Sequence, residues 1–130
     1  MFAPVEMGAY LGLIQGVINR MAGNSFLLKG WSVTLVAGLS AFAAKDAKPA
    51  FALIAAGVAI LFALLDSYYL AWERAYRNLY NAQATASDPS WSMAATRPDG
   101  GAYRSALGSV SVWPLHLVVV VAAVATAVLA

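Results

Sequence analysis

Hydrophobic and polar positions divide this chain into stretches of different character. Residues 4–24 carry apolar side chains at spacings of three and four, which is the pattern of an amphipathic helix. Three later stretches, 27–44, 50–70 and 110–130, are almost continuously apolar. Each approaches the ~20 residues with which a helix crosses a membrane. We therefore predict an all-α membrane protein, one membrane domain over residues 1–130, with three transmembrane helices behind an N-terminal amphipathic helix.

The junction between the amphipathic stretch and the first apolar stretch has the sequence VINRMAGNSFLLKGW. Gly23 and Asn24 suit a helix C-terminus, and Ser25 suits the N-cap of a following helix. These residues predict an elbow between a helix on the inner leaflet and the first span. Arg20 and Lys29 would then face lipid headgroups or a neighbouring chain, with Lys29 snorkelling to the interface. A cleaved signal peptide is a poor alternative, because the N-terminus lacks a basic region and its apolar residues are periodic.

The second apolar stretch runs on without a helix breaker as LLDSYYLAWERAYRNLY, so residues 71–82 are predicted to extend that span as a cytoplasmic stalk. A 4-3-4-3 spacing of apolar residues indicates a packed seam, for which the N-terminal helix is the nearest partner. Interfacial anchoring is the alternative for the aromatic residues nearest the span. The seam consists of Leu65, Tyr69, Trp72, Tyr76 and Leu79.

Residues 83–109 are rich in Ala, Ser, Thr, Gly and Pro, and we predict a cytoplasmic loop there. Trp91 is the exception within it, since a lone Trp in such a loop usually docks on a neighbouring element.

Composition agrees with a membrane protein, because 62% of the 130 residues are hydrophobic and 11% are charged. The short flanks of the spans set the orientation. Two basic residues lie in the KDAKP turn and six lie on the opposite side. This distribution predicts a cytoplasmic N-terminus and an external C-terminus.

Glycine recurs at every fourth position of the N-terminal helix, at Gly8, Gly12 and Gly16. Each glycine costs about 1 kcal/mol relative to alanine inside a helix, so such a row needs a compensating benefit. Close approach of a second helix would supply one, and these glycines together with Tyr69 are candidate contacts in a homo-oligomer. A helix that simply lies on the inner leaflet is the alternative.

Catalytic and metal-binding patterns are missing from the sequence. It contains one histidine and no cysteine, and it has no HExxH, nucleophile-elbow or phosphate-loop motif. We therefore expect no enzyme activity, no cofactor and no metal. Asp66 and His116 are ionisable residues inside predicted spans, and they are expected at similar depth as pore or gating candidates. Direct pairing, a pore-lining ring of Asp66 and snorkelling of Asp66 are the alternatives.

Basic and aromatic residues gather where the spans meet the cytoplasm. Such a mixture binds single-stranded nucleic acid or nucleotides through phosphate contacts and base stacking. Anionic lipid would satisfy the same charges. The candidate ligand-binding residues, expected at one level, are Arg20, Lys29, Arg74, Arg77, Trp72, Tyr76 and Tyr80.

The segments INRMAGNSFLLKGW, LLDSYYLAWERAYRNLY and DPSWSM resemble small bacterial membrane proteins found beside anti-phage defence genes, most closely the channel-type effector of the Hailong system. The resemblance covers about residues 14–92. It implies a homo-oligomeric channel in the bacterial inner (cytoplasmic) membrane that depolarises the infected cell. It also implies control by a nucleotide or single-stranded DNA made by a partner enzyme.

A homo-oligomeric gated pore is thus our leading hypothesis, with membrane lipid and other copies of the chain as partners. Three helices are too few to enclose an aqueous path alone. A holin-like permeabiliser and a structural or assembly subunit of a larger membrane complex are the alternatives.

Overall fold

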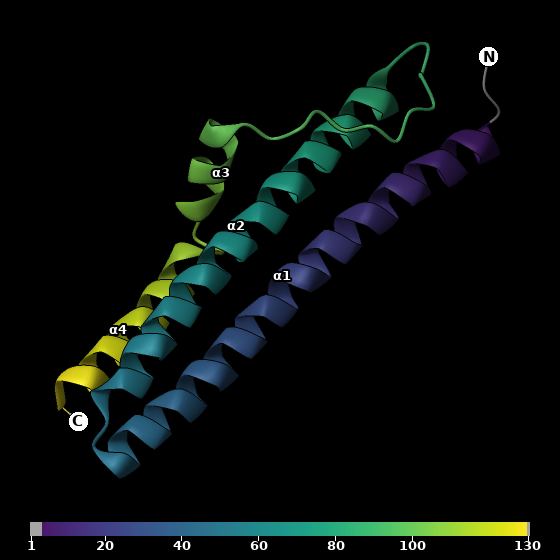
Figure 1. Ribbon diagram of the computed structural model, residues 1–130. Helices are drawn as coiled ribbons and strands as arrows, with labels where there is room; N and C mark the ends of the chain where they lie inside the picture. The colour runs from purple at the N-terminus through teal and green to yellow at the C-terminus, as the bar shows by residue number, and fades with distance from the viewer. Residues whose placement is uncertain (1–3, 130) are drawn as a thin grey trace.

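The computed structural model describes residues 4–129, and all regular structure in that range is helical (Figure 1). This confirms the predicted all-α class. Ala130, the last residue of the predicted third span, lies outside the described residues. The four helices are α1 (Pro4–Asp46), α2 (Pro49–Thr85), α3 (Gly100–Leu107) and α4 (Trp113–Leu129).

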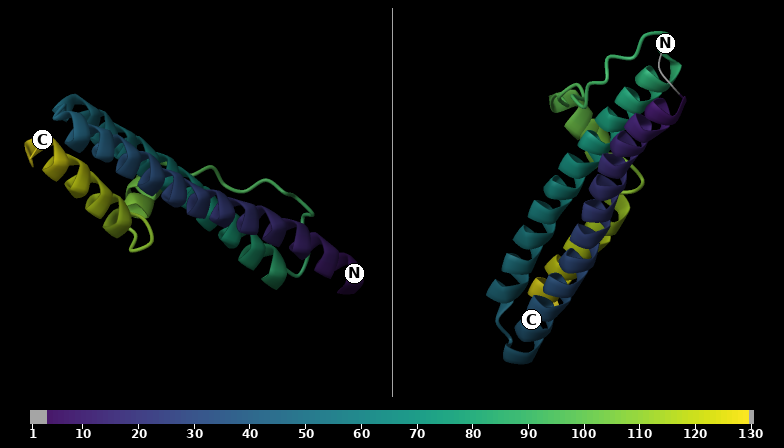
Figure 2. Two further views of the ribbon diagram at one scale, coloured as in Figure 1. Left: turned by 90° about the horizontal axis from the view of Figure 1, so that it is seen from below. Right: turned by 90° about the vertical axis from the view of Figure 1, so that its right-hand side faces the viewer.

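An antiparallel hairpin of α1 and α2 forms the long axis of the molecule. The two helices lie side by side along most of their length, and α4 accompanies them only in the part nearer the hairpin turn (Figure 2). The turn is tight: the amide of Lys48 donates to the carbonyl of Ala43 at 3.1 Å, and Ala47 adopts a left-handed φ of 50°. Pro49 then begins α2, where its fixed φ suits the first helical turn.

The predicted elbow is wrong, because α1 is one unbroken helix of 43 residues. Its polar residues at the expected bend are accommodated on helix faces. Gln15 Nε2 donates to Asn19 Oδ1 one turn away at 3.0 Å, and Ser25 turns inward toward α2 and does not cap a helix. Because α2 packs alongside both halves of α1, tertiary contacts outweigh the weak local preference of Gly23 and Asn24 for a helix end.

The predicted stalk is confirmed as a continuation of the second apolar stretch, since α2 runs without a break to Thr85. Its outer part packs against the N-terminal half of α1, as the seam predicted. Tyr76 and Leu79 belong to this contact, whereas Leu65 is exposed. The α1 side of the contact consists of Tyr10, Ile14 and Ile18, all buried.

Residues 86–99 form a strap that returns from the end of α2 across the stalk. Trp91 docks on α1 as predicted, with its ring edge-on to Tyr10 at 5.1 Å between centroids. The Tyr10 hydroxyl also donates to the carbonyl of Ser92 at 2.5 Å. Trp91 has a φ of 57°, which is rare for a bulky side chain and persists only where packing holds it.

Helix α3 lies within the stretch predicted as a loop, so that prediction is wrong for residues 100–107. Its N-cap is Asp99, whose side chain accepts from the amide of Ala102 at 2.8 Å. Tyr103 stacks on Tyr68 of α2, with centroids 6.0 Å apart and planes within 4° of parallel. This contact fixes a short helix whose own sequence gives little helical signal.

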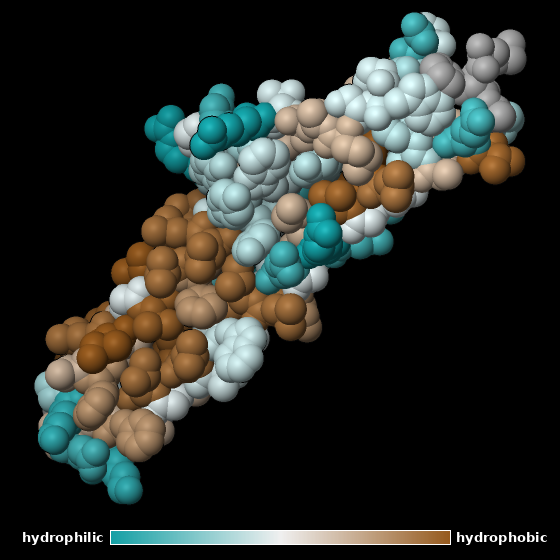
Figure 3. Space-filling view, turned by 45° about the vertical axis from the view of Figure 1, so that its right-hand side comes forward, coloured by the Kyte–Doolittle hydropathy of each residue, from teal (hydrophilic) through white to brown (hydrophobic). Residues whose placement is uncertain are grey.

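An apolar band covers the part of the molecule nearer the hairpin turn, where α4 lies. On the face shown in Figure 3, it is bounded by the hydrophilic hairpin turn on one side and by the more polar stalk on the other. Two helices, α1 and α2, are long and apolar enough to cross a membrane, and α4 is a shorter apolar helix of 17 residues. The large exposed side chains of the band include Phe26, Leu27, Trp31, Leu53, Ile54, Ile60, Leu61, Leu117, Val118 and Val121.

A substitution at Gly23 distinguishes a continuous α1 from an elbow. A Cβ built at Gly23 meets no atom within 4 Å, so alanine fits without a clash. Because alanine favours a helix interior, we expect Gly23→Ala to raise the free energy of unfolding by up to about 1 kcal/mol. Thermal unfolding in detergent, followed by circular dichroism, measures the change. A loss of stability would instead indicate a helix end at this position.

Candidate functional site: a buried ionic cluster joining three helices

The carboxylate of Asp66 is fully buried where α1, α2 and α4 meet. Lys29 Nζ of α1 lies 2.6 Å from Asp66 Oδ2, and His116 Nε2 of α4 lies 2.8 Å from the same oxygen. The hydroxyl of Ser25, also on α1, donates to Asp66 Oδ1. We refer to Ser25, Lys29, Asp66 and His116 as the Asp66 cluster. Each of the three apolar helices supplies at least one of its members.

Helix geometry on α1 aligns the first two members of the cluster. Ser25 and Lys29 are four residues apart, so their side chains share one face, and Lys29 Nζ donates to Ser25 Oγ at 2.8 Å. The side chain of Lys29 is 22% exposed, and it therefore reaches the carboxylate from the surface of the bundle.

His116 comes from the first turns of α4, next to a compact turn. The amide of Trp113 donates to the carbonyl of Ser109 at 3.0 Å, and the amide of His116 donates to the carbonyl of Val112. Val112 is buried and anchors this turn against the bundle. Pro114 follows, at a point where a helix needs no amide donor. The imidazole is thereby directed at α2.

The predicted pairing of Asp66 with His116 is confirmed, and snorkelling of Asp66 is wrong. A ring of Asp66 facing a pore is not formed by this conformation, because the carboxylate lies inside one chain. The prediction that Lys29 faces lipid headgroups or a neighbouring chain is wrong, because Lys29 pairs with Asp66 within the chain. A signal for this pair exists in the sequence: Lys29 lies 18 residues before Ala47 and Asp66 lies 19 after it, so a straight hairpin brings the two charges to one level.

With Lys29 and Asp66 ionised and His116 neutral, the cluster carries no net charge. A neutral arrangement is the one that a buried site tolerates. Even so, taking an ion pair out of water costs several kcal/mol per charge, and replacement of such pairs by apolar residues is often neutral or stabilising. The cluster therefore contributes little net stability to the fold. Its presence among apolar helices favours a functional role.

The basic and aromatic candidates do not assemble on one face. Arg74 lines a groove of about 540 Å³ together with Asn78, Thr96 and Arg97, between α2 and the strap. Arg77 lies on another side of α2, in a two-bond contact with Glu73 at 2.7 and 3.0 Å. The structure thus separates the two arginines that the sequence placed in one site.

Packing also uses the predicted stacking aromatics. Tyr76 and Tyr80 contact the buried face of α1, and the rings of Trp72 and Tyr76 lie 6.1 Å apart. Arg20 is exposed on α1. We expected the basic residues Arg20, Lys29, Arg74 and Arg77 at one level along the helices. Lys29 does not fit, because it lies beside Asp66. Arg74 is eight residues, or about 12 Å, further along α2.

Gly8, Gly12 and Gly16 lie on the exposed face of α1, turned away from the residues that contact α2. A Cβ at any of them would meet nothing within 4 Å, so no contact inside the chain requires glycine there. Self-association through this row stays a prediction. Tyr69 is partly buried beside Tyr68, with ring centroids 5.5 Å apart.

Within residues 4–129, no group of three or more His, Asp or Glu side chains is arranged to hold a metal ion. Comparison of the chain with known protein families, with curated proteins and with solved structures finds no match.

The cluster predicts an asymmetric response to single substitutions. Lys29→Met leaves a fully buried carboxylate without its cation, and we expect it to lower the free energy of unfolding by about 3–5 kcal/mol. Asp66→Leu should cost less, because the partly exposed Lys29 can turn toward solvent. The double variant should be more stable than Lys29→Met alone. Chemical unfolding in detergent at pH 8 measures all three, and strictly additive losses would contradict the ion pair.

Proposed function

We propose that copies of this chain assemble into a gated pore in the cytoplasmic membrane of a bacterium. The Asp66 cluster is the observation that carries the proposal. It is a charged contact among apolar helices, at the edge of the apolar band, and charged groups at such depth commonly mark ion paths and gates in membrane proteins.

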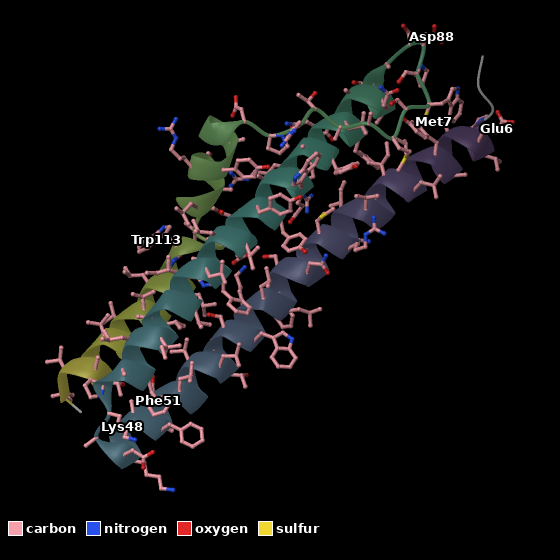
Figure 4. All side chains as sticks on the ribbon, in the orientation of Figure 1. Glu6, Met7, Lys48, Phe51, Asp88 and Trp113 are labelled. Carbon is pink, nitrogen blue, oxygen red and sulfur yellow. The ribbon has the colours of Figure 1, made fainter. Side chains whose placement is uncertain are left out.

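The exposed apolar band supports insertion in a membrane. Only 17% of the most apolar part of α1 and 28% of that of α2 is buried within the chain. The core helix of a soluble domain would instead be mostly covered. Lipid satisfies such a surface, and Trp113, near the boundary between band and stalk, suits the interface (Figure 4).

We propose that the stalk faces the cytoplasm. Lys45 and Lys48 are at the hairpin turn, and the remaining six basic residues are at or beyond the level of the Asp66 cluster, toward the stalk. An excess of Lys and Arg on the stalk side favours a cytoplasmic location. Helix α4 would be the third span, although its 17 residues give only about 25 Å of helix and require local thinning of the bilayer.

Conduction through this fold requires several copies. Small residues fill the interior of the three-helix part. Two grooves lie along the stalk, and a third lies on the outer face of α1. The path would therefore form between chains, with the glycine row of α1 as a candidate contact. In each chain, the closed Asp66 cluster would hold α4 against the hairpin in the resting state.

The resemblance to a channel-type defence effector supports a further part of the proposal: a nucleotide or single-stranded DNA signal from a partner enzyme sets the gate. The guanidinium groups of Arg74 and Arg97 both line the groove between α2 and the strap, which makes it a candidate site for such an anion. A ligand there shifts the gate only through its different affinity for the open and closed states.

Conductance of the purified protein in planar bilayers tests the pore. We expect a defined homo-oligomer with discrete currents, and Asp66→Asn should raise open probability several-fold, because the neutral amide binds Lys29 and His116 more weakly. Asp88→Asn, which neutralises an exposed loop carboxylate, is the matched control and should leave the currents unchanged. A monomer that conducts nothing would overturn the proposal and favour an assembly subunit, for which the open glycine face is suited.

A further inference from the structure

The imidazole of His116 is in an environment that suits only one of its protonation states. The residue is 2% exposed, and its Nε2 faces Asp66 Oδ2 at 2.8 Å. Because a carboxylate only accepts, Nε2 carries the proton of this contact. Nδ1 is buried and has no hydrogen-bond partner within residues 4–129. A neutral imidazole with a bare Nδ1 therefore satisfies the site.

A second proton on His116 would change both the hydrogen bonding and the charge of the cluster. Nδ1–H would be a buried donor without an acceptor, which costs free energy comparable to a lost hydrogen bond or more. The other charged groups of the cluster are Lys29 from α1 and Asp66 from α2. One carboxylate would then face two cations in a buried site, and the cluster would carry a net positive charge.

Among residues 113–118, which form the first part of α4, His116 alone is fully buried. Val112 fills the bundle just before the helix, and the next buried residues of α4 after His116 are Val119 and Ala123. These last two pack on small side chains of α2 and on Val36 of α1. The polar contact of His116 is thus the directional link between the first turns of α4 and the hairpin.

We propose that the Asp66 cluster is a proton-sensitive lock, in which protonation of His116 releases the start of α4 from α1 and α2. Opening exposes His116 to water, which hydrates the extra charge. The consequence for conduction, an acid-opened gate, rests on the proposed pore; the release of α4 does not.

The absence of cysteine from the chain permits a direct test with single reporter thiols. Val112→Cys places a thiol at a fully buried position beside His116, and Val110→Cys places one at a position that is 83% exposed. Both are alkylated with maleimide in detergent between pH 8 and pH 5. Dividing the first rate by the second removes the pH dependence of thiol chemistry. We expect this ratio to rise about tenfold in acid, the change given by about 1.4 kcal/mol of opening.

His116→Gln is the control variant, since its amide N–H can still donate to Asp66 but takes up no proton. In that background the ratio should stay flat. A ratio that does not change with pH when His116 is present would overturn the lock. An equal rise in the His116→Gln background would also overturn it, because the proton would then bind to a group other than His116. Ala123→Cys, buried further along α4, serves as reporter if Val112→Cys fails to fold.

The readout is independent of currents. A flat ratio in a protein that conducts overturns the lock alone. A rising ratio in a protein that does not conduct supports the lock and overturns the pore.

Discussion

A carboxylate can remain ionised among apolar helices only if its charge is met, and in this chain the carboxylate of Asp66 is met from two other helices. This requirement fixes the rotation of α1 about its axis, since Ser25 and Lys29 must face α2. It also fixes the height of α4, since His116 must reach the same oxygen. Apolar packing alone would allow α1, α2 and α4 to pack in several relative positions, whereas the buried charge of Asp66 selects one of them.

The two helices of the hairpin pack differently on the two sides of this cluster, toward the turn and toward the stalk. Between the cluster and the turn, α2 presents alanines to α1 and α4, and such small residues let the helices approach one another closely. In the stalk, the contact is built from Tyr, Ile and Leu, and the strap adds Trp91 and a hydrogen bond from Tyr10. The first kind of contact depends on fit, and the second on apolar area removed from water.

Much of this arrangement could be predicted from the sequence, because it follows from long patterns. The continuous apolar stretches predict the long helices of the hairpin. The seam through Tyr76 and Leu79 predicts the contact between the stalk and the N-terminal half of α1. The pairing of Asp66 with His116 followed from their depths. The predicted elbow is wrong because the local preferences of the polar residues at 19–25 do not include the contact with α2. That helix lies alongside and supplies Asp66 as the partner of Ser25. Helix α3 was missed because its stability comes from the Asp99 cap and the Tyr68 stack, which a single segment does not reveal.

The continuity of α1 has a mechanical consequence. A helix without a hinge moves as a rigid lever, and α1 extends about 30 Å on each side of Ser25, at the level of the cluster. A tilt of about 5° about that fulcrum would shift the end near the strap and the end near the turn by about 3 Å in opposite directions. Any force on the stalk is thereby transmitted to the far side of the apolar band without a change in secondary structure.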